Sequence, residues 1–198
     1  MTSLGAGLHA LDAVETGTTP DHPEVAATYR DLAELHRLQG EVAEAETYAR
    51  RALAITASRL GTAHPDTAAD SVTLAVLLAK QARYDEAEPL LRQALTTFDA
   101  ARGGASYMAA VAAHELGVLL ADRGEADEAA SLYCRSVAIK RHVLGPEHPE
   151  VATTLHNWAL LAGATGQVEQ ARRLWADAEA TLNPASRHQE KEDQRTEG

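Results

Sequence analysis

Histidine and cysteine are the side chains of this sequence with the most varied chemistry. His114 and His156 lie 42 residues apart, and Glu115 or Asp122 beside the first could complete a metal site. Helical zinc sites, however, usually pair two ligands at i and i+4, and neither histidine has such a partner. Cys134 has no basic neighbour in the sequence that would favour the thiolate. We therefore expect polar contacts from the two histidines, a packing role for the cysteine and no metal site.

Three other patterns also have plain structural explanations. Gly103-Gly104 lacks both the Lys-Ser/Thr of a phosphate loop and a preceding strand. The adjacent carboxylates Asp127-Glu128 fall on a predicted turn. His-Pro occurs at 22–23, 64–65 and 148–149, where proline suits the first turn of a helix. We therefore interpret His-Pro as structural and predict no catalytic residue and no cofactor; the protein is not expected to be an enzyme.

The His-Pro pairs mark an internal repeat. They are spaced by 42 and 84 residues, and the missing pair falls at Ser106-Tyr107. Other columns keep the period of 42, among them Gly40, Ala82, Gly124 and Gly166, then Ala45, Ala87, Ala129 and Ala171, and also Leu35, Leu77, Leu119 and Leu161. The sequence therefore predicts four units, at about 20–61, 62–103, 104–145 and 146–183.

Each unit has the apolar spacing of two helices. In the first, Val25, Tyr29 and Leu32 recur in steps of three and four, Gly40 ends the stripe, and a second stripe begins at Ala45. Small residues in both stripes let the helices approach closely, and no strand pattern is present. We predict an all-α fold of helix–turn–helix units. The junction into the third unit reads "ARGGASYMA" and lacks His-Pro, so we expect the most flexible junction there.

Composition and charge limit the function classes. The 198 residues carry a net charge of −11 and are 45% hydrophobic but only 4% aromatic. An acidic protein repels phosphate, so we expect neither nucleic-acid binding nor anionic-membrane binding. A single cysteine and the lack of a long apolar segment or secretory signal predict a cytoplasmic protein.

The two ends of the chain differ from the units. Residues 1–19 are interpreted as an N-terminal capping segment or a degenerate half repeat. Glu179 stands where earlier units have an aliphatic residue, so we expect the last helix to be a polar C-terminal cap. Residues 184–198 combine mixed charge with no apolar period, and we predict a disordered polar tail.

The motif "HPEVA…LA…L…QG…EAE…ARRAL…LG" resembles the tetratricopeptide repeat, in the 42-residue variety typical of kinesin light chains and many bacterial proteins. The resemblance covers about residues 20–182, and the Ala/Arg-rich composition fits a bacterial origin. It implies a right-handed α-solenoid of four stacked helix pairs whose first helices line a concave groove. By the family's geometry the groove residues would be Arg30, Glu34, Arg37, Val72, Val76, Lys80, Val111, His114, Val118, Asp122, Thr153, His156, Asn157 and Leu160.

The resemblance implies a non-catalytic interaction module that binds a peptide or helix of a partner protein in this groove. The alternative is a ligand- or peptide-gated regulator in bacterial signalling or transcription control. Recognition of a chaperone's C-terminal carboxylate is not expected, because Glu34, Thr73 and Glu115 stand where that clamp needs basic or amide groups. Only Asn157 keeps the asparagine of the kinesin-light-chain "NLA" motif, so cargo recognition does not transfer. The partner and the oligomeric state stay open.

Overall fold

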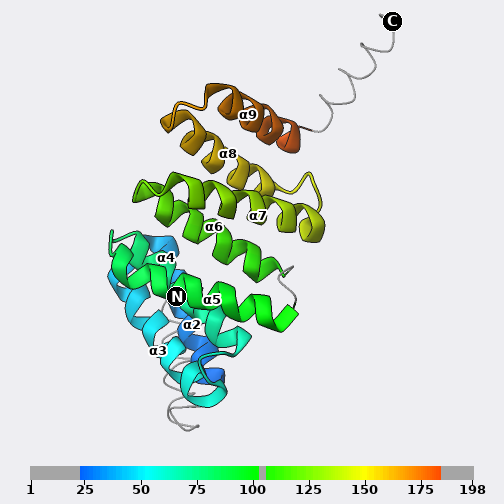
Figure 1. Ribbon diagram of the computed structural model, residues 1–198. Helices are drawn as coiled ribbons and strands as arrows, with labels where there is room; N and C mark the ends of the chain where they lie inside the picture. Colours follow the sequence, from blue (N-terminus) through cyan, green and yellow to red (C-terminus); the bar gives the residue numbers. More distant parts are fainter. Residues whose placement is uncertain (1–22, 103–105, 184–198) are drawn as a thin grey trace, which may run out of the picture. The chain divides into compact units, whose positions relative to one another are not determined.

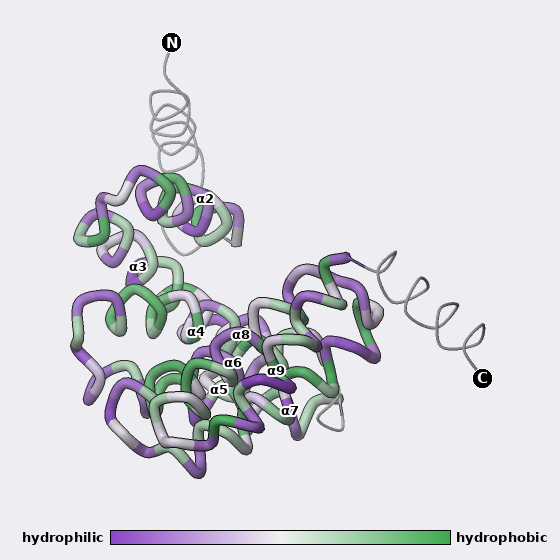
Figure 2. The backbone as a smooth tube through the Cα atoms, turned by 90° about the horizontal axis from the view of Figure 1, so that it is seen from above, coloured by the Kyte–Doolittle hydropathy of each residue, from purple (hydrophilic) through white to green (hydrophobic). Residues whose placement is uncertain are grey.

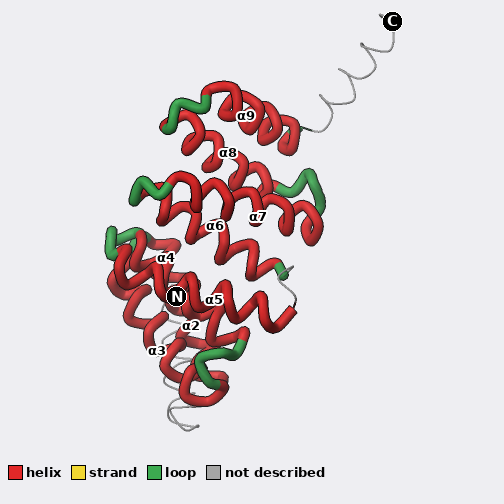
Figure 3. The backbone as a smooth tube through the Cα atoms, in the orientation of Figure 1, coloured by secondary structure: helices red, strands yellow, loops and turns green. Residues whose placement is uncertain are grey.

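The computed structural model describes residues 23–102 and 106–183 (Figure 1). In these ranges the chain forms eight α-helices and no strand, which confirms the predicted all-α fold (Figure 3). The helices are α2 (Pro23–Gln39), α3 (Val42–Leu60), α4 (Pro65–Ala79), α5 (Tyr84–Arg102), α6 (Tyr107–Asp122), α7 (Ala126–Leu144), α8 (Pro149–Ala164) and α9 (Val168–Leu182). The predicted N-terminal capping segment 1–19 and polar tail 184–198 lie outside the described residues.

The chain divides into two compact units, Met1–Ala101 and Arg102–Gly198, here called unit 1 and unit 2. Unit 1 contains the hairpins α2/α3 and α4/α5, and unit 2 contains α6/α7 and α8/α9. In unit 1 α3 also packs on α4, and in unit 2 α7 packs on α8. Each unit is therefore a stack of two helical hairpins. The boundary falls beside the segment where the repeat lacks His-Pro.

Left-handed backbone at one position reverses the chain within every hairpin. Gly40, Gly124 and Gly166 have φ of 80°, 81° and 77°. After Gly40 the N–H of Glu41 donates to the carbonyl of His36 (2.9 Å), which satisfies a carbonyl at the helix end. Ala82 takes the same place in α4/α5 with φ 57°, a conformation that its Cβ disfavours.

The His-Pro pairs at 64–65 and 148–149 cap helices. His64 Nδ1 accepts a hydrogen bond from the N–H of Asp66 (3.1 Å), and His148 Nδ1 accepts one from the N–H of Glu150 (3.3 Å). Both histidines therefore have the structural role predicted for them, as acceptors for orphan donors of the first turn. The third repeat unit has no His-Pro pair. There Ser106 Oγ accepts a hydrogen bond from the N–H of Ala109 (3.1 Å) and caps α6 instead.

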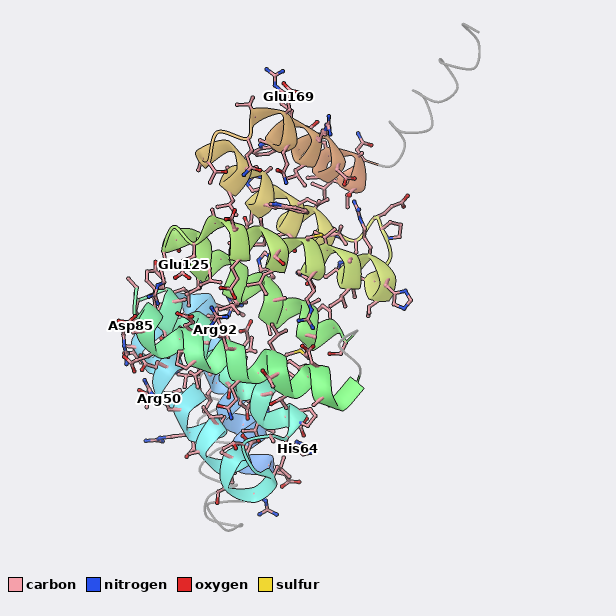
Figure 4. All side chains as sticks on the ribbon, in the orientation of Figure 1. Arg50, His64, Asp85, Arg92, Glu125 and Glu169 are labelled. Atoms are coloured by element: carbon pink, nitrogen blue, oxygen red, sulfur yellow. The ribbon has the colours of Figure 1, made fainter. Side chains whose placement is uncertain are left out.

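Close helix packing holds each hairpin together. Three alanines that recur with the period of 42, Ala45, Ala87 and Ala129, are fully buried. The helices carry both hydrophilic and hydrophobic residues, as amphipathic helices do (Figure 2). Ion pairs add contacts between the two hairpins of unit 1. Arg83 Nη1 lies 2.8 Å from Glu46 Oε2, and Arg50 Nη2 lies 3.3 Å from Glu86 Oε2 (Arg50 is labelled in Figure 4).

Candidate partner-binding surface

The predicted binding residues of unit 1 lie on α2 and α4 and are mostly charged. Arg37 donates two hydrogen bonds to Glu34, from Nε to Oε2 and from Nη2 to Oε1, each 2.6 Å. The pKa of Glu34 lies below its usual value because of this hydrogen bonding and, to a smaller degree, the charges of Arg37 and Lys80. The structure thus brings Glu34 and Arg37 of α2 near Lys80, the residue that follows α4.

Three of the predicted binding residues of unit 2 are aliphatic and at least partly exposed. Val118 on α6 and Leu160 on α8 occupy one column of the repeat, and α6 contacts α8 directly. Val118 is partly exposed and Leu160 is 53% exposed. Val111, about two turns before Val118, is also partly exposed. We call Val111, Val118 and Leu160 the apolar face of unit 2.

The structure corrects two predicted groove residues, Val72 and His114, which are buried. Val72 is only 4% exposed and belongs to the core. His114 packs against Tyr133, with 5.9 Å between ring centroids, and its Nε2 lies 3.5 Å from Asn157 Nδ2. Burial, and after it the charge of Lys140, lowers the pKa of His114 to about 4, so the ring is neutral at physiological pH.

The column that contains Val72 and His114 meets the following hairpin of the same unit at two of its members, Arg30 and His114. Its first member, Arg30 on α2, reaches across to α4, where Nη1 lies 3.4 Å from Asp70 Oδ2. Its last member, His156, has no following hairpin in the described part of the chain. His156 and the neighbouring Thr153 line a pocket at the end of unit 2 instead. Residues of one repeat column therefore differ in their surroundings according to the hairpin that carries them.

A buried ion pair joins the two hairpins of unit 2, and sequence reasoning missed it. Lys140 on α7 is almost fully buried, with Nζ 3.2 Å from Glu150 Oε2 and 3.2 Å from Thr154 Oγ1. Tyr107 donates a second hydrogen bond to Glu150 Oε1 (2.7 Å). Burial opposes the ionisation of Glu150, but the bonds from Tyr107 and Lys140 outweigh it, so its pKa is lowered. A lysine in the column of Thr56 and Phe98 was the signal for this contact.

The structure also bears on the cysteine and on metal and membrane binding. Cys134, expected to be a packing residue, is exposed. The part of the chain that the structure describes contains no group of three or more His, Cys, Asp or Glu side chains that could hold a metal ion. Among the same residues, no helix combines the length and apolar character needed to cross a membrane.

Comparison with known proteins identifies similar repeats. The family model "Tetratricopeptide repeat" matches residues 4–58, 24–100 and 107–189. A crystal structure of a putative kinesin light chain from Podosopora anserina, with nearly identical TPR-like repeats, is 25% identical to this chain. Its TM-score is 0.76, over 93% of this chain and 87% of that one. No curated protein matches the sequence.

Two more distant structures share the fold. BtubC (BKLC) from P. vanneervenii is 24% identical, with TM-score 0.74, over 83% of this chain. The apo form of RapI is 15% identical, with TM-score 0.78, over 93% of this chain. The chain spans 66% of the length of each of these two structures.

Proposed function

We propose that this chain, which belongs to the tetratricopeptide repeat family, binds a peptide or helix of a partner protein on the exposed surface of its first helices. Such repeats are generally non-catalytic, and their similarity to kinesin light chain repeats is consistent with an interaction module. The single observation that carries the proposal is the apolar face of unit 2. Leu160 is a large aliphatic side chain that is more than half exposed, and it shares a repeat column with partly exposed Val118 on α6, a helix that contacts α8.

Apolar residues exposed side by side on adjacent helices offer a partner a dry contact. Polar groups around them supply orientation: Asn157 is half-buried next to Leu160 on α8, and Asp122 follows Val118 by one turn. The face fits a partner segment that buries aliphatic side chains, as an amphipathic helix does. The charged cluster of Glu34, Arg37 and Lys80 on unit 1 fits polar and ionic contacts with a partner. A cytoplasmic location is part of the proposal, since the exposed thiol of Cys134 suits a reducing compartment.

The test is affinity purification from the native cell followed by mass spectrometry. We compare the wild type with the double variant Val118→Glu/Leu160→Glu, which places two charges on the apolar face. The matched control is Val143→Glu, which changes an exposed aliphatic residue on the second helix α7. The proposal expects one or more proteins to be lost with the double variant and kept with the control, while circular dichroism shows equal helix content. Identical sets of bound proteins from all three would contradict it.

A further inference from the structure

The far end of unit 2 carries a second surface that the proposed function does not use. A pocket of ≈ 320 Å³ opens between α8 and α9. Its lining includes His156 of α8 and Trp175, Glu179 and Leu182 of α9. The His156 and Trp175 rings meet edge to face, with 4.4 Å between centroids. The last helix, predicted to be a polar cap, therefore presents an aromatic ring and an aliphatic side chain beside Glu179.

The preceding hairpin shows what normally covers such a surface. His114 and Tyr133 occupy the repeat positions of His156 and Trp175, and both are buried. Helix α8 lies against this surface at His114, which Asn157 contacts. The surface at His156 and Trp175 is thus the next step in the same series of stacked hairpins, and no further described helix occupies it. The equivalent surface of the α6/α7 hairpin packs against a helix, so we expect an α-helix to fit the surface of α8/α9 as well.

Exposed apolar residues form one line along α9. Val168, Trp175 and Leu182 follow one another at intervals of seven residues and are 53%, 39% and 63% exposed. Seven residues make nearly two helical turns, so the three side chains lie on one side of the helix. Arg172 and Glu179 flank this line on one side and are also seven residues apart. We call these five residues the α9 stripe.

We propose that the α9 stripe packs antiparallel against the α9 stripe of a second copy of this chain. A two-fold axis at Trp175 places Val168 of one copy opposite Leu182 of the other and brings the two tryptophans together. The same operation puts Arg172 beside Glu179 of the second copy, and does so twice. Each tryptophan then faces the pocket beside His156 of the other copy. This inference is independent of the proposed function.

Charge complementarity favours a second copy over an unrelated helix. Arg172 and Glu179 are about 10 Å apart along one helix, at 1.5 Å per residue, so they cannot pair within a chain. Within the chain Arg172 makes an exposed contact with Glu169 at 3.4 Å (Glu169 is labelled in Figure 4). The sequence numbers of Arg172 and Glu179 are nearly symmetric about Trp175, as are those of Val168 and Leu182. An antiparallel pair of identical helices satisfies both relations at once.

Sedimentation equilibrium of the full chain tests the proposal. We expect a reversible monomer–dimer equilibrium with a dimer of twice the mass of one chain. Arg172→Glu opposes like charges at both symmetry-related contacts and should raise the dimer Kd by about tenfold. The double variant Arg172→Glu/Glu179→Arg restores opposite charges across the axis and should return Kd close to the wild-type value. Arg173→Glu makes the same charge change at the next residue, which points away from the stripe, and should leave Kd unchanged.

Two further measurements keep the outcome decisive. Trp175→Glu should abolish the dimer while circular dichroism retains the helix content, and raising the salt concentration should weaken the wild-type dimer. A monomer at every concentration would overturn the proposal, whether the surface is covered by another segment of the chain or by a different protein. A dimer that responds equally to Arg172→Glu and Arg173→Glu, or one that the double variant fails to rescue, would overturn it as well.

Discussion

The two units place opposite charges at the same buried position between their hairpins. In unit 1 Thr56 on α3 donates from Oγ1 to Asp70 Oδ2 on α4 (2.8 Å). In unit 2 the equivalent positions are Lys140 on α7 and Thr154 on α8, and Lys140 donates to the threonine (3.2 Å). The hydroxyl and the charged group have therefore exchanged helices, and the charge has changed sign. The repeat specifies a buried polar contact between hairpins but not which ion makes it.

The surroundings decide whether the charge is tolerated. Burial raises the pKa of Asp70, because the hydrogen bond from Thr56 and the charge of half-exposed Arg30 only partly offset the loss of water. In unit 2 Lys140 is paired with Glu150, whose pKa is lowered despite its own desolvation. Protonation of Asp70 therefore stabilises the folded state, whereas protonation of Glu150 destabilises it. The charged groups at the two equivalent junctions therefore give the units opposite responses to acid.

The largest expected effect follows from removing the partner of Lys140. Glu150→Gln keeps an acceptor for Tyr107 but leaves the buried ammonium without its counter-charge. We expect a loss of about 2 kcal/mol in the free energy of unfolding, below the value for a fully buried pair because Glu150 is 37% exposed. Urea denaturation measures it.

The control for this variant is Lys140→Met/Glu150→Gln, which removes the charge that would be stranded. The double variant should regain most of the lost stability. If it is instead as unstable as Glu150→Gln alone, the loss does not come from an unpaired Lys140.

Alanine-to-leucine variants compare how tightly the two hairpins of unit 2 are packed. Ala129 is fully buried, whereas Ala171, in the same column of the last hairpin, is 8% exposed. A leucine at either place forces the paired helices apart, which typically costs ~1–3 kcal/mol. We expect Ala129→Leu, like Ala87→Leu in unit 1, to be more destabilising than Ala171→Leu in chemical denaturation. A larger loss for Ala171→Leu would mean that the last hairpin is the more tightly constrained of the two.

Asp70→Asn tests the other half of the comparison. Because the pKa of Asp70 is raised in the folded state, its ionisation weakens folding above that pKa. Asparagine can still accept the hydrogen bond from Thr56, so at neutral pH we expect a gain of about 0.5–1 kcal/mol, the scale of one polar contact. The gain should shrink as the pH falls through the folded pKa and vanish below the unfolded one.

The pH dependence of Glu150→Gln should have the opposite course. Glu150 has a lowered folded pKa, so the cost of this variant is present above the unfolded pKa and disappears as the pH falls through the folded one. Denaturation curves at several pH values measure both variants. If the stability changes of Asp70→Asn and Glu150→Gln varied with pH in the same direction, the opposite charges at the two junctions would not be their cause.

The smallest effect concerns the turn of α4/α5. Ala82 has φ 57° where the other hairpins have glycine. Ala82→Gly relieves the Cβ contact but increases the entropy of the unfolded chain, so we expect a net gain of about 0.5 kcal/mol. Gly124→Ala, the reciprocal change in unit 2, should be destabilising. A loss of stability in Ala82→Gly would show that the turn is not strained.

Period and spacing were sufficient to predict the helices, their turns and the role of His-Pro. They also predicted close packing, although Gly117 departs from the alanine of its column for a reason seen only in three dimensions. A Cβ there would lie 3.0 Å from Cε1 of Tyr133, whose ring fills the space. Tyr133 and Gly117 belong to different helices, so neither the period nor the helical spacing links them.

The binding surface was less predictable, because residues of one repeat column differ in burial from hairpin to hairpin. Val72 and His114 belong to the same column as exposed Arg30, yet both are buried. The buried charge of Lys140 was equally hidden, since its partner Glu150 lies across the hairpin boundary. By contrast, Val118 and Leu160 share one column and are both at least partly exposed, as the resemblance implied for this column.

Site-specific photo-crosslinking in the native cell tests the proposed binding role most directly. A photoreactive amino acid replaces Leu160 on the apolar face or, as the control, Val143 on the second helix α7, where the side chain is also exposed. We expect a covalent adduct with a partner protein from position 160 and none of the same mass from position 143. The same adduct from both positions, or from position 143 alone, would contradict binding through the first helices.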